Sequence, residues 1–97
     1  MKKAYLLVFS DEFGTREQVK QWLNEMPEII TWRYDMPHSF YVISENTAAE
    51  IANPLHDRSG KGRFLVSEIT ANKWGWLPQA TWYLLDQKEH KPTPKAK

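Results

Sequence analysis

The hydrophobic pattern of this chain changes period several times in a fixed order, and that order constrains the fold more than any other feature. Residues 3–10 and 39–44 are short apolar runs, rich in aromatic and β-branched side chains, and are typical of strands. Residues 29–34 and 63–70 are two further strand-like runs. Two stretches between them have the spacing of amphipathic helices. The predicted order is therefore strand, helix, strand, strand, helix, strand.

Each predicted helix begins at a capping box, in which two side chains satisfy backbone N–H groups that the first turn leaves without partners. The two boxes are Thr15 with Gln18 and Thr47 with Glu50. We expect the first helix to end at Pro27 and the second to close near Pro54, because proline disrupts the helical hydrogen bonds. Residues 57–62 are then a polar, glycine-containing loop.

This order predicts an α+β domain of split βαβ (ferredoxin-like) architecture, β-α-β-β-α-β, with a short C-terminal helix from Pro78 to Asp86. Right-handed crossovers put the strands at residues 3–10 and 39–44 in the centre of the sheet. We expect one domain over residues 1–87. Residues 88–97, rich in Lys and Pro, are predicted to be a disordered tail.

Both faces of the two central strands are apolar, although two helices cover only one face of a four-stranded sheet. The second face needs another cover, either a partner subunit or the Trp-rich segment over residues 74–85. We favour a homodimer to which the terminal segment contributes. The candidate interface residues are Tyr41, Trp74 and Trp76, since aromatic side chains are enriched at protein interfaces.

Composition excludes several classes of protein. The chain has no cysteine, which excludes thiol catalysis and a Cys-based zinc site and fits a reducing cytoplasm. The first apolar run stops at Ser10, too early for a secretory signal, and no later stretch is long enough to cross a bilayer. We therefore expect a cytoplasmic protein without a membrane partner. The net charge is only +1, and residues 88–97 contribute four Lys to it. The rest of the chain therefore has no excess of basic residues, and overall charge gives no support for a basic nucleic-acid-binding face.

Several short motifs follow one another in the order seen in a known family. They are Tyr5-Leu6-Leu7-Val8, Trp32, Phe40-Tyr41-Val42-Ile43, Thr47-Ala48-Ala49-Glu50-Ile51, Phe64-Leu65-Val66-Ser67-Glu68-Ile69 and Gly75-Trp76-Leu77-Pro78 followed by Trp82. With these motifs, over roughly residues 3–85, the chain resembles the small, mostly uncharacterised bacterial proteins labelled SinR family. This resemblance implies the α+β fold over the whole domain.

The chain is similar, more distantly, to the CRISPR-associated small ferredoxin-like nuclease-type proteins. That group forms homodimers through the sheet, and an Asp just after its first strand is implicated in metal binding. Here Phe9-Ser10-Asp11 ends the first strand, and the Asp stands one residue later than in that pattern. The resemblance makes Asp11 the candidate catalytic and metal-binding residue, with Mg²⁺ as the cofactor of such a nuclease.

Two loops contain residues that suit binding chemistry. Asp11 and Glu12 carry neighbouring carboxylates, which suit a hard cation such as Mg²⁺, although a solvated loop is the simpler interpretation. Arg58, Lys61 and Arg63 lie near two glycines, a composition that suits a phosphate or a nucleic-acid backbone. They lack the P-loop pattern, and an exposed turn is the simpler interpretation.

The remaining motifs leave three classes of function open. The histidines His38, His56 and His90 share no metal-ligand spacing and are interpreted as surface residues. The aromatic set that can stack unpaired bases, or else pack in a core or interface, is Trp32, Tyr34, Phe40, Tyr41, Trp74 and Trp76. We expect first a non-enzymatic, homodimeric interaction or regulatory protein, second a nucleic-acid-binding protein, and third a metal-dependent nuclease.

Overall fold

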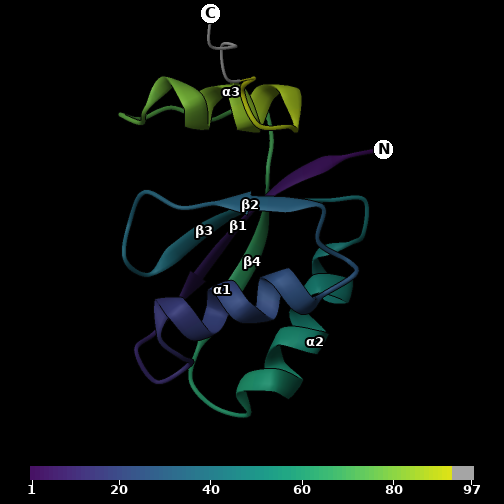
Figure 1. Ribbon diagram of the computed structural model, residues 1–97, viewed down its shortest axis with the longest axis vertical. Helices are drawn as coiled ribbons and strands as arrows, with labels where there is room; N and C mark the ends of the chain where they lie inside the picture. The colour runs from purple at the N-terminus through teal and green to yellow at the C-terminus, as the bar shows by residue number, and fades with distance from the viewer. Residues whose placement is uncertain (93–97) are drawn as a thin grey trace, which may run out of the picture.

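The computed structural model describes residues 1–92 of the chain as an α+β domain with a four-stranded antiparallel sheet and three helices (Figure 1). The spatial order of the strands is β2-β3-β1-β4. It places β1 and β3 in the centre, as their apolar sequences predict, and is compatible with a ferredoxin-like fold. The strands are β1 (Lys3–Phe9), β2 (Thr31–Arg33), β3 (Ser39–Ser44) and β4 (Phe64–Ile69).

Both predicted capping boxes are confirmed. At the start of α1 (Arg16–Glu25), the Gln18 backbone N–H donates to the Thr15 hydroxyl at 3.1 Å, and the Thr15 N–H donates to the Gln18 side chain at 2.9 Å. At the start of α2 (Ala48–Ser59), Thr47 and Glu50 make the same reciprocal pair at 3.2 and 2.9 Å. The two helix starts are therefore fixed by local sequence.

The prediction that the second helix closes near Pro54 is wrong, because α2 continues to Ser59 and ends only at Gly60. Gly60 adopts the left-handed conformation, with φ of 70°, and its N–H donates to the His56 carbonyl oxygen. The residue after the proline, Leu55, is fully buried. Its burial and the terminal glycine offset the hydrogen bond that Pro54 cannot make. The first half of the loop predicted at residues 57–62 is consequently helical.

The helices lie on opposite sides of the sheet (Figure 1). Helices α1 and α2 cover one face, where side chains of β1 and β3 meet the buried residues of both helices. This cluster contains Tyr5, Leu7, Phe9, Phe13, Val19, Leu23, Met26, Phe40, Val42, Ile51 and Leu55. We call this side of the sheet the first face.

The third helix, α3 (Gln79–Gln87), lies across the opposite side, which we call the second face (Figure 1). Its Leu84 and Leu85 pack on a smaller buried cluster formed by Ala4, Tyr41 and Ile43. The second face is therefore covered in part by the chain's own terminal segment, one of the two predicted covers. The helix covers only the end of the sheet near these residues.

The end of the described chain makes defined contacts. Lys88 follows α3 with φ of 62°, and the ring of His90 lies 2.6 Å from the Thr31 hydroxyl, measured between Nε2 and Oγ1. The tail predicted to be disordered spans residues 88–97, of which 93–97 lie outside the described residues.

Candidate interaction surface

A groove of about 550 Å³ opens where the second face, the segment after β4 and the start of α3 meet. The sheet contributes Leu6 and Tyr41, and the β2–β3 connection contributes Met36. The wall opposite the sheet carries three indoles, those of Trp74, Trp76 and Trp82. Its volume is within the range of pockets that bind ligands or partner side chains.

The two tryptophans predicted at an interface are the most exposed large apolar residues after Met1. Trp74 is 87% exposed and Trp76 is 90% exposed. One face of Trp74 stacks on Trp82, with ring centroids 5.9 Å apart and an interplanar angle of 29°. Beside it, Lys73 Nζ lies 2.9 Å from Asp86 Oδ1. These contacts attach the segment after β4 to α3 and give the indole of Trp74 a fixed support.

The apolar surface continues from the groove along the uncovered part of the second face. Side chains alternate between faces along a strand, so Val8 follows Leu6 on this face, and Leu65 lies opposite Val8 in the neighbouring strand. Val8 is 41% exposed and Leu65 is 63% exposed. Sequence reasoning placed neither residue at the surface, since it did not predict how far the terminal helix reaches over the sheet.

A partly buried polar network holds α3 in place. Arg33 Nε donates to Thr81 Oγ1 at 2.6 Å, and this hydroxyl donates in turn to Asp35 Oδ2 at 2.6 Å. Arg33 also forms an ion pair with Asp35 at 3.4 Å. Thr81 has no exposed surface. The network fixes the orientation of the helix, and thereby the position of the groove wall.

Tyr41, the third predicted interface residue, is 3% exposed and lies beneath α3, so its ring reaches the surface only at the floor of the groove. Its hydroxyl is buried without a hydrogen-bond partner in the part of the chain that the structure describes. Burial raises the pKa of Tyr41, and the Asp35 carboxylate raises it further, against the lowering effect of Arg33. The structure gives Tyr41 a role in supporting α3.

Asp11, the candidate catalytic and metal-binding residue, lies in the turn after β1 with its side chain 88% exposed. Its carboxylate contacts the ring of His38, a pairing that sequence analysis missed. The pairing arises because the Phe9 N–H donates to the His38 carbonyl oxygen at 3.1 Å, which brings residues 27 positions apart to the same end of the sheet. Within residues 1–92, no group of three or more His, Cys, Asp or Glu side chains could hold a metal ion.

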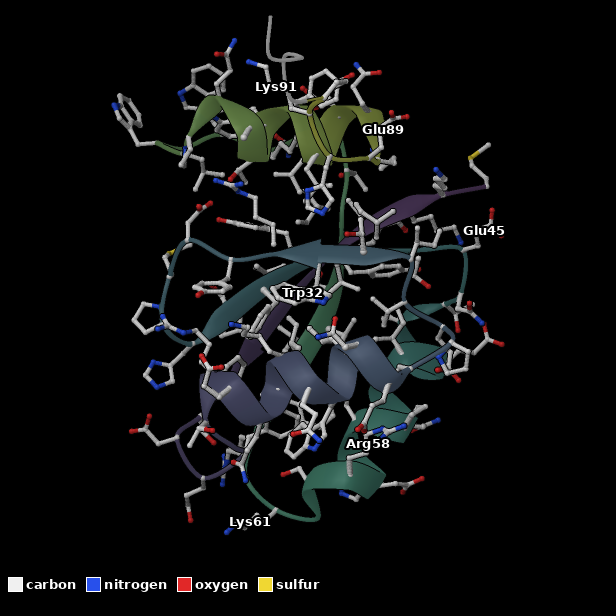
Figure 2. All side chains as sticks on the ribbon, viewed as in Figure 1. Trp32, Glu45, Arg58, Lys61, Glu89 and Lys91 are labelled. Carbon is white, nitrogen blue, oxygen red and sulfur yellow. The ribbon has the colours of Figure 1, made fainter. Side chains whose placement is uncertain are left out.

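The three candidate anion-binding cations do not share one site. Arg58 lies on α2 and pairs with Glu25 of α1, with 3.0 Å between Nη1 and Oε1, whereas Lys61 lies in the turn beyond the helix (Figure 2). Arg63 is bound through its backbone, which exchanges hydrogen bonds with Ser10 at 2.9 and 3.0 Å. The loop therefore connects two parts of the fold. Gly62 is needed in it, because a Cβ there would lie 2.2 Å from the backbone nitrogen of Phe13.

Three of the six aromatic side chains considered for base stacking pack against one another. Trp32 and Tyr34 both contact Phe40, at centroid distances of 5.5 and 5.4 Å, between the sheet and α1. The Arg16 guanidinium covers the ring of Tyr34 at 4.6 Å. Figure 2 shows Trp32 on this first-face side. Trp74 and Trp76 are thus the members of the set whose rings are exposed to a partner.

Comparison of the chain with protein-family models, with curated proteins and with solved structures gives no match. None of the helices within the described residues is long and apolar enough to cross a membrane.

Proposed function

We propose that this chain is a cytoplasmic, ferredoxin-like domain that acts as a homodimeric interaction or regulatory protein rather than as an enzyme. The observation that carries the proposal is the apolar surface on the second face, formed by Val8, Leu65, Met36, Trp74 and Trp76. Contiguous exposed apolar surface of this kind marks interaction sites on proteins that are otherwise monomeric. Two exposed indoles, those of Trp74 and Trp76, add the residue type that dominates binding energy at interfaces.

The contrast between the two sides of the sheet supports this interpretation. On the first face, the large side chains of β1 and β3 are covered by two helices. On the second face, one short helix covers β3 but leaves Val8 of β1 and Leu65 of β4 exposed to solvent. A sheet that is apolar on both sides needs both sides covered, and a second copy supplies the missing cover without another gene product.

The exposed indoles also favour a second candidate function, the binding of single-stranded nucleic acid. Trp74 and Trp76 present flat aromatic faces on which unpaired bases can stack. A mobility shift with single-stranded RNA or DNA that weakens steeply with salt would support this candidate. If no mobility shift is seen even at low salt, the nucleic-acid candidate is ruled out and the protein-interaction proposal is the one that stands.

The test of the proposal is the mass in solution, measured by light scattering over a range of protein concentrations. We expect a dimer whose dissociation constant rises by at least about tenfold in Leu65→Glu, because the substitution puts a charge into the apolar surface. Ile30→Glu is the matched control. Ile30 is 47% exposed and lies beside the other edge of the sheet, so its substitution should leave the dimer intact. A monomeric mass at high micromolar concentration would contradict the proposal.

A further inference from the structure

The outer edge of β4 has no partner strand within the described residues. The strand pairs with β1 along its whole length, from Phe64 opposite Phe9 to Ile69 opposite Ala4. It is the last strand in the order β2-β3-β1-β4, and no backbone hydrogen bond in residues 1–92 joins its outer side to another segment. A row of backbone donors and acceptors is therefore open to another chain.

The two edges of the sheet differ in how they are protected. At the opposite edge, β2 has only three residues, and Pro27 and Pro37 stand in the segments on either side of it. Short strands and neighbouring prolines are common protection against unwanted pairing. Strand β4 has six residues, no proline and one charged side chain, Glu68. Natural proteins rarely leave such an edge open, which indicates that it is paired when the protein functions.

The ladder between β1 and β4 shows which residues of β4 point outward. The Ser10 N–H donates to the Arg63 carbonyl oxygen at 2.9 Å, so the backbone groups of Arg63 face β1. In an antiparallel ladder this direction alternates. The backbone groups of Phe64, Val66 and Glu68 therefore point away from the sheet, and an occupant of this edge must be an extended strand.

We propose that the occupant is β4 of a second copy, which pairs in antiparallel direction about a two-fold axis through Ser67 and makes one continuous eight-stranded sheet. This inference rests on the proposed homodimer and adds a contact at the sheet edge beside Leu65; edge pairing by itself does not cover the second face with Trp74 and Trp76. Two identical edges satisfy each other's hydrogen bonds. Because each copy uses its open β4 edge, the assembly closes at two subunits.

The register follows from the outward groups and from the side chains. In an antiparallel pair, the backbone groups of two opposite residues both face the partner strand or both face away from it. Because this direction alternates along β4, the two-fold axis must pass through a residue and not between two. An axis at Ser67 places Leu65 opposite Ile69 of the partner subunit, which covers the most exposed apolar residue of β4. The same axis places Val66 opposite Glu68, but an axis at Val66 would place Leu65 opposite Ser67 and Phe64 opposite Glu68, which leaves Leu65 without an apolar partner.

Because the chain has no cysteine, an introduced cysteine can form a disulfide only with a cysteine introduced in another copy. At the proposed axis, Ser67 faces its own copy in a non-hydrogen-bonded pair, where Cα atoms are about 4.5 Å apart and a disulfide fits. We expect Ser67→Cys to give a covalent dimer on mild oxidation, seen on a non-reducing gel. In Leu65→Cys alone, the two cysteines would be separated by about four residues, or about 13 Å, and should not crosslink. Mixing Leu65→Cys with Ile69→Cys should give a covalent heterodimer.

Light scattering on the reduced proteins separates failure of this inference from failure of the proposed function. A reduced dimer in which Ser67→Cys does not crosslink would overturn pairing at this register and leave the homodimer in place. Crosslinking of Leu65→Cys alone that equals that of Ser67→Cys would overturn it as well. If the reduced proteins are monomers at every concentration, both the inference and the homodimer fall.

Discussion

The two faces of the sheet show different solutions to the same problem of covering an apolar strand pair. On the first face, α1 and α2 bury a continuous cluster that runs from Tyr5 to Leu55. On the second face, α3 buries a cluster of five residues and leaves Val8 and Leu65 in solvent. The difference indicates that the first face supplies most of the folding free energy, whereas the second face has surface left for a partner.

The second face also differs in the kind of interaction that fixes its cover. Helix α3 has nine residues and little apolar area to fix its orientation on the sheet. The buried hydroxyl of Thr81, which is hydrogen-bonded to both Arg33 and Asp35, fixes that orientation instead. Hydrogen bonds to charged groups are stronger than neutral ones and depend more on geometry. Polar contacts therefore fix the position of the groove beside α3, and its apolar side chains provide the surface on which a partner can pack.

The largest effect that would sharpen this comparison is expected from Phe40→Ala. Phe40 has no exposed surface and contacts Phe9, Trp32 and Tyr34 on the first face. Its truncation should lower the free energy of unfolding by about 3–5 kcal/mol, measured by urea denaturation, since it leaves a cavity in the main core. That loss is a large share of the stability of a small domain.

The matched variant on the second face is Leu84→Ala, which also truncates a fully buried side chain. We expect a loss nearer about 2 kcal/mol, because α3 can loosen without opening the main cluster. Hydrogen exchange should then speed up in α3 and stay slow in β1 and β3. Equal losses for the two variants, with uniform exchange, would show that the two faces unfold as one unit and would break the comparison.

Local sequence determined most of the fold. The strand at Ser39–Ser44 has the predicted bounds, and both helix starts were predicted because capping boxes act over four residues. The end of α2 was mispredicted because the penalty of Pro54 is local, whereas the burial of Leu55 that offsets it is a tertiary effect. The second strand is shorter than its sequence pattern, since an edge strand is limited by its one neighbour.

The candidate surface was predictable only in part. Trp74 and Trp76 were predicted at an interface and are exposed, but the burial of Tyr41 was not predicted, because it depends on where α3 crosses the sheet. The same crossing creates the bonds of Thr81 to Arg33 and Asp35, which are 48 and 46 residues away in sequence. Sequence periodicity has no information on such distant polar pairs.

A smaller effect is expected from Tyr41→Phe. This variant uses the pH dependence of stability to test whether α3 buries Tyr41 on the second face. The pKa of Tyr41 is raised above its ordinary value of 10.0 by burial and by Asp35. Above that pH the unfolded chain loses the phenolic proton while the folded chain keeps it, so wild-type stability should fall as the pH rises. Tyr41→Phe should be as stable as wild type or more stable at about pH 7, since the hydroxyl has no partner within residues 1–92, and should lose less stability at about pH 10.5.

Tyr5→Phe is the control for the neutral-pH arm of this experiment, because burial and the Glu68 carboxylate raise the pKa of Tyr5 as well. The Tyr5 hydroxyl donates to the Asn46 carbonyl oxygen at 2.5 Å, so its removal should cost about 1 kcal/mol already at neutral pH. Urea midpoints of the three proteins at the two pH values make the comparison. A loss of stability in Tyr41→Phe at neutral pH would mean that the hydroxyl has a partner, and that α3 lies differently on the sheet.

The smallest effect is expected from Asp11→Ala, which should change neither the urea midpoint nor the mass in solution. The side chain is exposed, and its contact with His38 joins two loops at the surface, where such pairs contribute little. In the proposed dimer, the two-fold axis reverses the direction of β1, so the two copies of Asp11 lie at opposite ends of the combined sheet and cannot share one Mg²⁺. We therefore expect no cleavage of RNA or DNA with Mg²⁺ by wild type or variant. Cleavage that wild type performs and Asp11→Ala loses would show that the domain is a nuclease, and would contradict the non-enzymatic role.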